Sequence, residues 1–219
     1  ARRTVYAPTG AGEVELTPGR WRVTAVRGFE HDIDEAAVTV PVDGPPARVD
    51  LTLPRVVDTV GWLAADLHLH AEGSGDSEVR FSERVRGLVA EGVELAVASD
   101  HNRVSDYGPA LRALGFEDRL AVMSGSEIST TGRRRWGHFN AFPLEETPRH
   151  HDTTPTKLFA DIRRGGERVI QVNHPRMPPR IGYFDLVNLA TGAGKAAERE
   201  WDTGFDVIEV FNGIWLAHP

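Results

Sequence analysis

The chain has 219 residues, no cysteine and a formal net charge of −7. Without cysteine there are no disulfides and no thiolate ligands, so any transition-metal site must use His, Asp and Glu. The excess of acidic over basic residues argues against nucleic acid as the main partner. No apolar run approaches the ~20 residues that a membrane-spanning helix needs. These features are typical of a globular protein with one or two domains.

Residues 1–58 show the alternation of apolar and polar residues that half-buried strands have. Such stretches begin at Val14, Trp21, Val38 and Val49. Turn residues separate them at Pro18-Gly19 and at positions 44–46. The pattern predicts a small all-β sandwich as a first domain, followed by a second domain over residues 59–219.

From about residue 60, strand-like runs alternate with segments of helical spacing. We expect strands at residues 62–70, 94–101, 120–128, 138–144, 168–174 and 205–211. Helices are expected from Phe81 to a stop at Gly92, from Tyr107 to Leu114, and after an N-cap at Thr154. Alternating strands and helices predict an α/β fold with a parallel sheet, either an open doubly wound sheet or a barrel. Polar residues at the carboxyl ends of the strands favour the barrel.

Candidate metal ligands lie at these strand ends. His68 and His70 are two apart on a strand, so both rings project from the same face. Asp76 follows in a Gly-rich loop, where a helix cap is the other interpretation. An isolated histidine pair is more often structural, and the metal hypothesis depends on the further ligands that follow.

Three more strand ends repeat the pattern. Asp100 and His101 follow a buried apolar run, and Glu127 follows another. A charged side chain in such a place needs a partner. His138 and His174 complete the set, although each alone fits a structural histidine equally well.

Several motifs carry a family resemblance. They are AADLHLH at 64–70, AVASDHN at 96–102, SGSEIST at 124–130, GHFNAF at 137–142, VNHPR at 172–176 and FDVIEVFNG at 205–213. In this order they resemble the polymerase and histidinol phosphatase (PHP) superfamily of metallohydrolases, in particular its carbaryl hydrolase-like branch. The β-rich start also resembles the sandwich of that branch. The resemblance implies a PHP-type distorted (β/α)7 barrel, incomplete at its C-terminus, behind a small all-β sandwich.

The resemblance also implies a ligand set for two or three divalent ions, which His and carboxylate ligands would allow to be Zn, Mn or Fe. One ion would be held by His68, His70 and Glu127, a second by Glu127, His138 and His174, and a third by Asp76 and His101. A final Asp-x-His motif of the family is absent here. We therefore expect the chain to be part of a longer protein whose continuation supplies that pair.

The implied function is hydrolysis of a phosphoester by a metal-bridged hydroxide, with Glu127, Asp100 and Arg176 as catalytic residues. Arg176, Arg103 and Arg180 follow the ligands and could bind an anionic small molecule, or lie at the rim as surface residues. The run 133–135 of arginines is interpreted as a solvated loop. Two alternatives stay open, namely carbamate or amide hydrolysis at the same site, and a non-catalytic binding module stabilised by metal.

Overall fold

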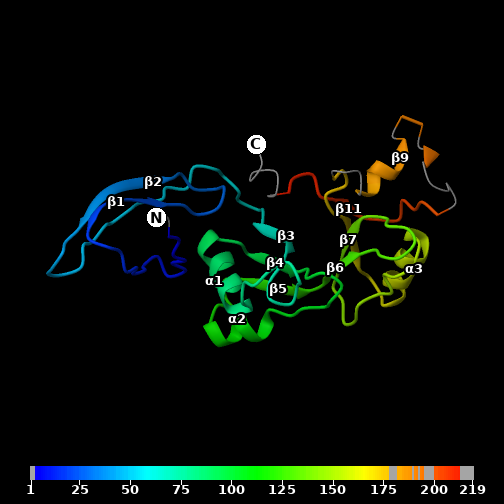
Figure 1. Cartoon of the computed structure of the whole chain (residues 1–219), viewed down its shortest axis with the longest axis horizontal. Helices are drawn as coiled ribbons and strands as arrows, with labels where there is room; N and C mark the ends of the chain where they lie inside the picture. Colours follow the sequence, from blue (N-terminus) through cyan, green and yellow to red (C-terminus); the bar gives the residue numbers. More distant parts are fainter. Residues whose placement is uncertain (1–2, 178–181, 189, 192, 195–199, 213–219) are drawn as a thin grey trace.

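The computed structural model describes residues 3–177, 182–188, 190–191, 193–194 and 200–212. In Figure 1 an N-terminal ribbon extends to one side of a body that holds the helices and the remaining strands. The body contains two larger sheets, each with its own group of buried apolar residues, and one small pair of strands.

The ribbon consists of strands β1 (Gly19–Ala25) and β2 (Asp34–Val40), which pair in antiparallel register from Gly19↔Val40 to Ala25↔Asp34. The stretches around Val14 and Val49 form no strand, and no side chain of residues 3–58 is buried. The predicted sandwich is therefore wrong. Two strands cannot cover each other's apolar face, so their alternating residues are only half-buried.

The first sheet of the body is parallel, in the order β3 (Ala65–Leu69), β4 (Leu95–Ala98), β5 (Ala121–Ser124). Helices α1 (Phe81–Glu91) and α2 (Gly108–Leu114) connect these strands, close to their predicted positions. The predicted stop of α1 is confirmed, because Gly92 adopts φ 78° there and its N–H bonds the last helical carbonyls. Apolar residues of both helices, including Val85, Leu88 and Leu111, form one core with the sheet.

The second sheet is mixed and has the order β11 (Val207–Ile208), β8 (Val169–Val172), β7 (His138–Phe142), β6 (Ser126–Ser129). Helix α3 (Pro155–Arg164) packs on this sheet with Leu158, Phe159 and Ile162. It begins as predicted, since the Thr154 hydroxyl accepts the N–H of Lys157. A 3₁₀ helix η1 (Tyr183–Leu186) and a small pair of strands, β9 (Val187–Asn188) and β10 (Ala193–Gly194), follow β8.

The predicted (β/α)7 barrel is wrong. In the described part of the chain no barrel closes, and β6, β7 and β8 pair antiparallel. The reason lies in residues 130–137, which join β6 to β7 and are fewer than the roughly dozen residues that a crossover between parallel strands requires. The chain must therefore turn back beside β6.

Gly125 separates β5 from β6, which the sequence pattern treats as one strand. A Cβ at this position would lie 2.8 Å from the Ala141 carbonyl oxygen and 3.2 Å from that of Ala98. At this bend, isolated bridges His101↔Glu127 and Ser105↔Gly125 join the residues that follow β4 to Gly125 and to β6. The two sheets thus meet along one line, and the polar strand ends gather beside it. Among the described residues, no helix has both the length and the apolar character needed to cross a membrane.

Candidate metal centre

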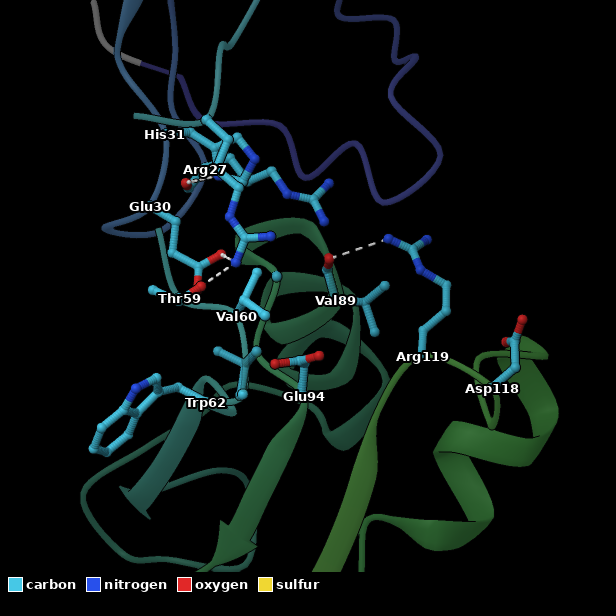
Figure 2. Close-up of a pocket in the computed structure, with 14 residues that line it drawn as sticks. Arg27, Glu30, His31, Thr59, Val60, Trp62, Val89, Glu94, Asp118 and Arg119 are labelled. Carbon is cyan, nitrogen blue, oxygen red and sulfur yellow. Dashed lines mark hydrogen bonds and ion pairs between the residues drawn. The ribbon is translucent and has the colours of Figure 1, made fainter. Parts of the chain in front are cut away.

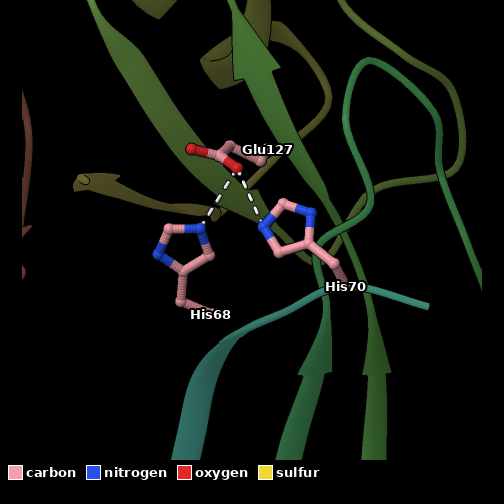
Figure 3. A group of neighbouring side chains, drawn as sticks. All are labelled: His68, His70 and Glu127. Carbon is pink, nitrogen blue, oxygen red and sulfur yellow. Dashed lines mark hydrogen bonds and ion pairs between the residues drawn. The ribbon is translucent and has the colours of Figure 1, made fainter. Parts of the chain in front are cut away.

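The Glu127 carboxylate lies at the centre of the polar strand ends and is 1% exposed. Imidazole nitrogens from five histidines surround it. Oε2 lies 3.1 Å from His68 Nε2, 3.0 Å from His70 Nε2 and 3.3 Å from His101 Nδ1, whereas Oε1 lies 3.0 Å from His138 Nδ1 and 3.1 Å from His174 Nε2. Figure 3 shows how His68 and His70 approach the carboxylate side by side. Each oxygen thus has its own group of imidazoles.

Both sheets supply these side chains. His68 lies on β3 where a bulge interrupts the pairing with β4, and its N–H is bonded to Asp66 Oδ1. Bulges redirect side chains, which suits a ligand position. His138 opens β7 opposite Ser129, so the antiparallel turn brings it to the same edge as the carboxyl end of β6. His174 follows β8 at that edge.

Asp76 extends the cluster on one side. Its carboxylate lies 3.3 Å from His70 Nδ1 and 3.3 Å from His101 Nε2, and the Ser74 hydroxyl donates to it at 2.6 Å. Three groups of side chains are close enough together to hold an ion. They are His68, His70 and Glu127; His70, Asp76 and His101; and His101, Glu127 and His138. The first agrees with the predicted grouping, the second adds His70 to the predicted pair, and the third has His101 in place of the predicted His174.

The geometry fits divalent cations. Ligand atoms about 2.0–2.2 Å from one ion lie about 3.0–3.5 Å from each other, which is the spacing between these nitrogens and the Glu127 oxygens. Hydrogen bonds alone suit the arrangement less well. A carboxylate offers about four acceptor positions, fewer than the five rings that surround it. Cations held jointly by the rings and the carboxylate would remove this mismatch.

The charges of the cluster shift its pKa values strongly. Burial by itself would lower the pKa of His68, but hydrogen bonds to Glu127 and Glu209 outweigh burial and raise this pKa to about 10. Burial would raise the pKa of Glu127, yet the imidazoles, beginning with His138, hold it well below its usual value. For His101 burial prevails and lowers the pKa. The centre therefore contains a firmly ionised carboxylate, which is the form that binds cations.

The other predicted catalytic residues are Asp100, which precedes His101, and Arg176, which follows His174 by two positions. Asp100 is fully buried, its Oδ1 accepts the N–H of Ala71 at 2.7 Å, and its Oδ2 has no hydrogen-bond partner. It thus fixes the start of the loop that carries Asp76. The exposed Arg176 lies 3.4 Å from Asp185. Arg180 lies outside the described residues.

Two arginines of the run 133–135 form ion pairs with acidic side chains at the protein surface. Arg133 lies 3.6 Å from Asp152, and Arg134 lies 2.6 Å from Glu200 with its guanidinium over the Trp136 ring. These contacts agree with the interpretation of a solvated loop.

Sequence reasoning missed Glu209, which lies just past β11. Its Oε1 is 2.8 Å from His68 Nδ1, and its Oε2 accepts the N–H of His174 at 2.6 Å. Burial would raise the pKa of this carboxyl, but the hydrogen bond with His68 prevails and lowers it. The sequence offers one signal, because Glu209 is the only charged residue in the apolar run from Val207 to Phe211.

A cavity of about 500 Å³ lies elsewhere, where residues 27–31 and 55–62 meet the end of α1 and residues 118–119. Its charged groups mostly bind each other or the backbone. Arg55 lies 3.0 Å from Glu30, and Arg119 donates to the Val89 carbonyl at 3.4 Å (Figure 2). None of the candidate metal ligands is among the residues that line this cavity.

Comparison with known proteins gives no family for the chain: no family model matches it, and no curated protein matches its sequence significantly. The resemblance to PHP metallohydrolases stays a prediction. A functional assignment must therefore be argued from the geometry of the centre.

Proposed function

We propose that this protein is a metal-dependent hydrolase that cleaves phosphate esters at ions bound around Glu127. One observation carries the proposal: five imidazole nitrogens converge on the two oxygens of a single buried carboxylate, three on one oxygen and two on the other. A carboxylate with ligand groups on both oxygens suits the bridging of two ions, and paired ions are common in enzymes that cleave phosphate esters.

The exposure of the ligands supports an enzyme over a structural metal site. Structural sites enclose their ion completely, whereas catalytic sites leave a position open for water or substrate. The centre has a closed and an open side. The His68 side chain is 10% exposed, but that of His101 is 28% exposed and that of Asp76 is 52% exposed. Substrate would therefore approach from the side of His101 and Asp76.

Each part of the centre has a distinct task in this proposal. His68, His70, His138 and His174 would hold the ions together with Glu127, and His101 with Asp76 would complete the set at the open side. Divalent ions bound there would supply Lewis acidity and lower the pKa of water. Arg176, exposed two residues after His174, remains the residue that we propose for binding an anionic group of the substrate.

Hydrolysis assays test the proposal. The protein is freed of metal with a chelator, reloaded with Mn²⁺ or Zn²⁺, and assayed with an aryl phosphate monoester, an aryl phosphodiester and an aryl carbamate. We expect metal-dependent cleavage of a phosphate ester that His68→Ala abolishes and that the matched control His151→Ala retains, because His151 is exposed and lies outside the centre. Cleavage of the carbamate alone would favour carbamate hydrolysis. Stoichiometric metal without turnover of any substrate would favour a non-catalytic module.

A further inference from the structure

The Glu209 carboxylate connects the two sheets at the metal centre. Glu209 follows β11 in the mixed sheet, whereas its partner His68 lies on β3 in the parallel sheet. Its second partner, His174, follows β8, the strand beside β11. Asn212 also donates to it, at 2.9 Å. One carboxylate therefore holds two candidate ligands that approach Glu127 from different sheets.

The contact with His68 determines which ring nitrogen faces the centre. An ionised carboxylate can only accept hydrogen bonds, so Nδ1 of His68 must carry a proton to bond Glu209 Oε1 at 2.8 Å. In a neutral ring this leaves Nε2 with a free lone pair. Nε2 is the atom that lies 3.1 Å from Glu127 Oε2, so its lone pair is directed to where an ion would bind.

The contact with His174 acts on the backbone. His174 has φ 25°, a positive value that a residue with a Cβ seldom adopts and that surrounding contacts must stabilise. The hydrogen bond from its N–H to Glu209 Oε2 is such a contact. This backbone conformation brings Nε2 of His174 within 3.1 Å of Glu127 Oε1.

We propose that Glu209 is a positioning residue of the metal centre, which orients the His68 ring through Nδ1 and the His174 backbone through its N–H, so that both present Nε2 to the ions. The inference rests on the proposed metal centre and adds a residue that binds no ion itself. Partners behind a metal-binding histidine typically contribute about 10- to 100-fold in metal affinity.

Metal affinity is the first test, measured with Zn²⁺ by competition against a chromophoric chelator on the whole chain. Glu209→Gln keeps the shape but places an amide against one of its donors, and we expect about 10- to 100-fold weaker Zn²⁺ binding. Asp206→Asn is the matched control. Asp206 also joins β11 to its neighbours, through Ile170 N–H at 2.7 Å and Arg163 at 2.8 Å, and is not one of the residues around Glu127. Asp206→Asn should lower the melting temperature and leave the Zn²⁺ affinity within about twofold of the wild-type value.

The ring nitrogens of His68 give a second test that needs no variant. In Zn²⁺-loaded, ¹⁵N-histidine-labelled protein, NMR should find His68 protonated at Nδ1 and metal-bound at Nε2. Binding through Nδ1, unchanged affinity in Glu209→Gln, or an equal loss in Asp206→Asn would each overturn the role of Glu209 while the metal centre stands. Failure of the wild-type protein to bind Zn²⁺ would remove the metal centre and this inference together.

Discussion

Nε2 of His68 lies 3.1 Å from Oε2 of Glu127, although the two residues are 59 positions apart and belong to different sheets. The parallel sheet and the mixed sheet therefore share one polar centre where they meet. Substitutions at this centre should change metal binding far more than they change the packing of the two apolar cores. One core contains α1 and α2, and the other contains α3.

Glu127→Gln should nearly abolish metal binding at the two groups of ligands that include Glu127. The substitution keeps the size of the side chain but removes the charge that all five imidazoles face. We expect a loss of affinity beyond the roughly 10- to 100-fold that follows removal of a partner behind a ligand. Elemental analysis after dialysis measures the retained metal. Glu35→Gln, whose carboxylate accepts from Thr24 on the ribbon, is the control and should retain wild-type metal content.

Asp76→Asn should remove one ion and spare the others. Asp76 belongs to the group with His70 and His101 and is absent from the two groups that include Glu127. Native mass spectrometry of the metal-loaded protein should show one ion fewer than in the wild type. Loss of every ion, or of none, would show that the groups are not separate binding positions.

The metal-free protein should lose stability as the pH rises through the alkaline range. The folded pKa of His68 is raised to about 10 from an ordinary value of 6.5. A raised pKa means that the folded state binds this proton more tightly, so the stabilisation is complete below pH 6.5 and is lost as the pH approaches 10. Melting temperatures in chelator between pH 6 and 10 should fall more steeply for the wild type than for His68→Gln. Parallel curves would contradict the raised pKa.

Gly125→Ala should destabilise the junction of the sheets. A Cβ there would lie 2.8 Å from the Ala141 carbonyl oxygen, which belongs to a strand and cannot easily move. We expect the free energy of unfolding to fall by about 1–3 kcal/mol. Gly75→Ala is matched to it, because a Cβ at that position has nothing within 4 Å, and it should change stability by less than about 0.5 kcal/mol. Urea unfolding measures the free energy of unfolding of both variants. An equal, small change in the two variants would contradict the close contact at Gly125.

Local signals in the sequence predicted local structure well. Gly92 ends α1 and Thr154 begins α3 as expected, because caps depend on a few neighbouring residues. Placement near strand ends also selected His68, His101, Glu127 and His174, and the structure brings these side chains together. Their role as metal ligands stays a prediction.

The arrangement of the strands could not be read from the same signals. Periodicity indicates a strand but not the direction in which its neighbour runs, so the antiparallel return from β6 to β7 was mistaken for one more parallel step. The ribbon shows the same limit, because alternation at Val14 and Val49 occurs without a strand. Glu209 was missed because its role depends on a contact with His68, 141 positions away in the chain.

The central claim is that Glu127 lies between bound ions, and a crystal structure of the Mn²⁺-loaded protein tests it directly by anomalous scattering at the manganese edge. We predict separate anomalous peaks beside Oε1 and Oε2 of Glu127, each about 2.0–2.3 Å from an oxygen and from a surrounding imidazole nitrogen. A map without such peaks, in which the imidazoles bond the carboxylate directly at saturating Mn²⁺, would contradict it.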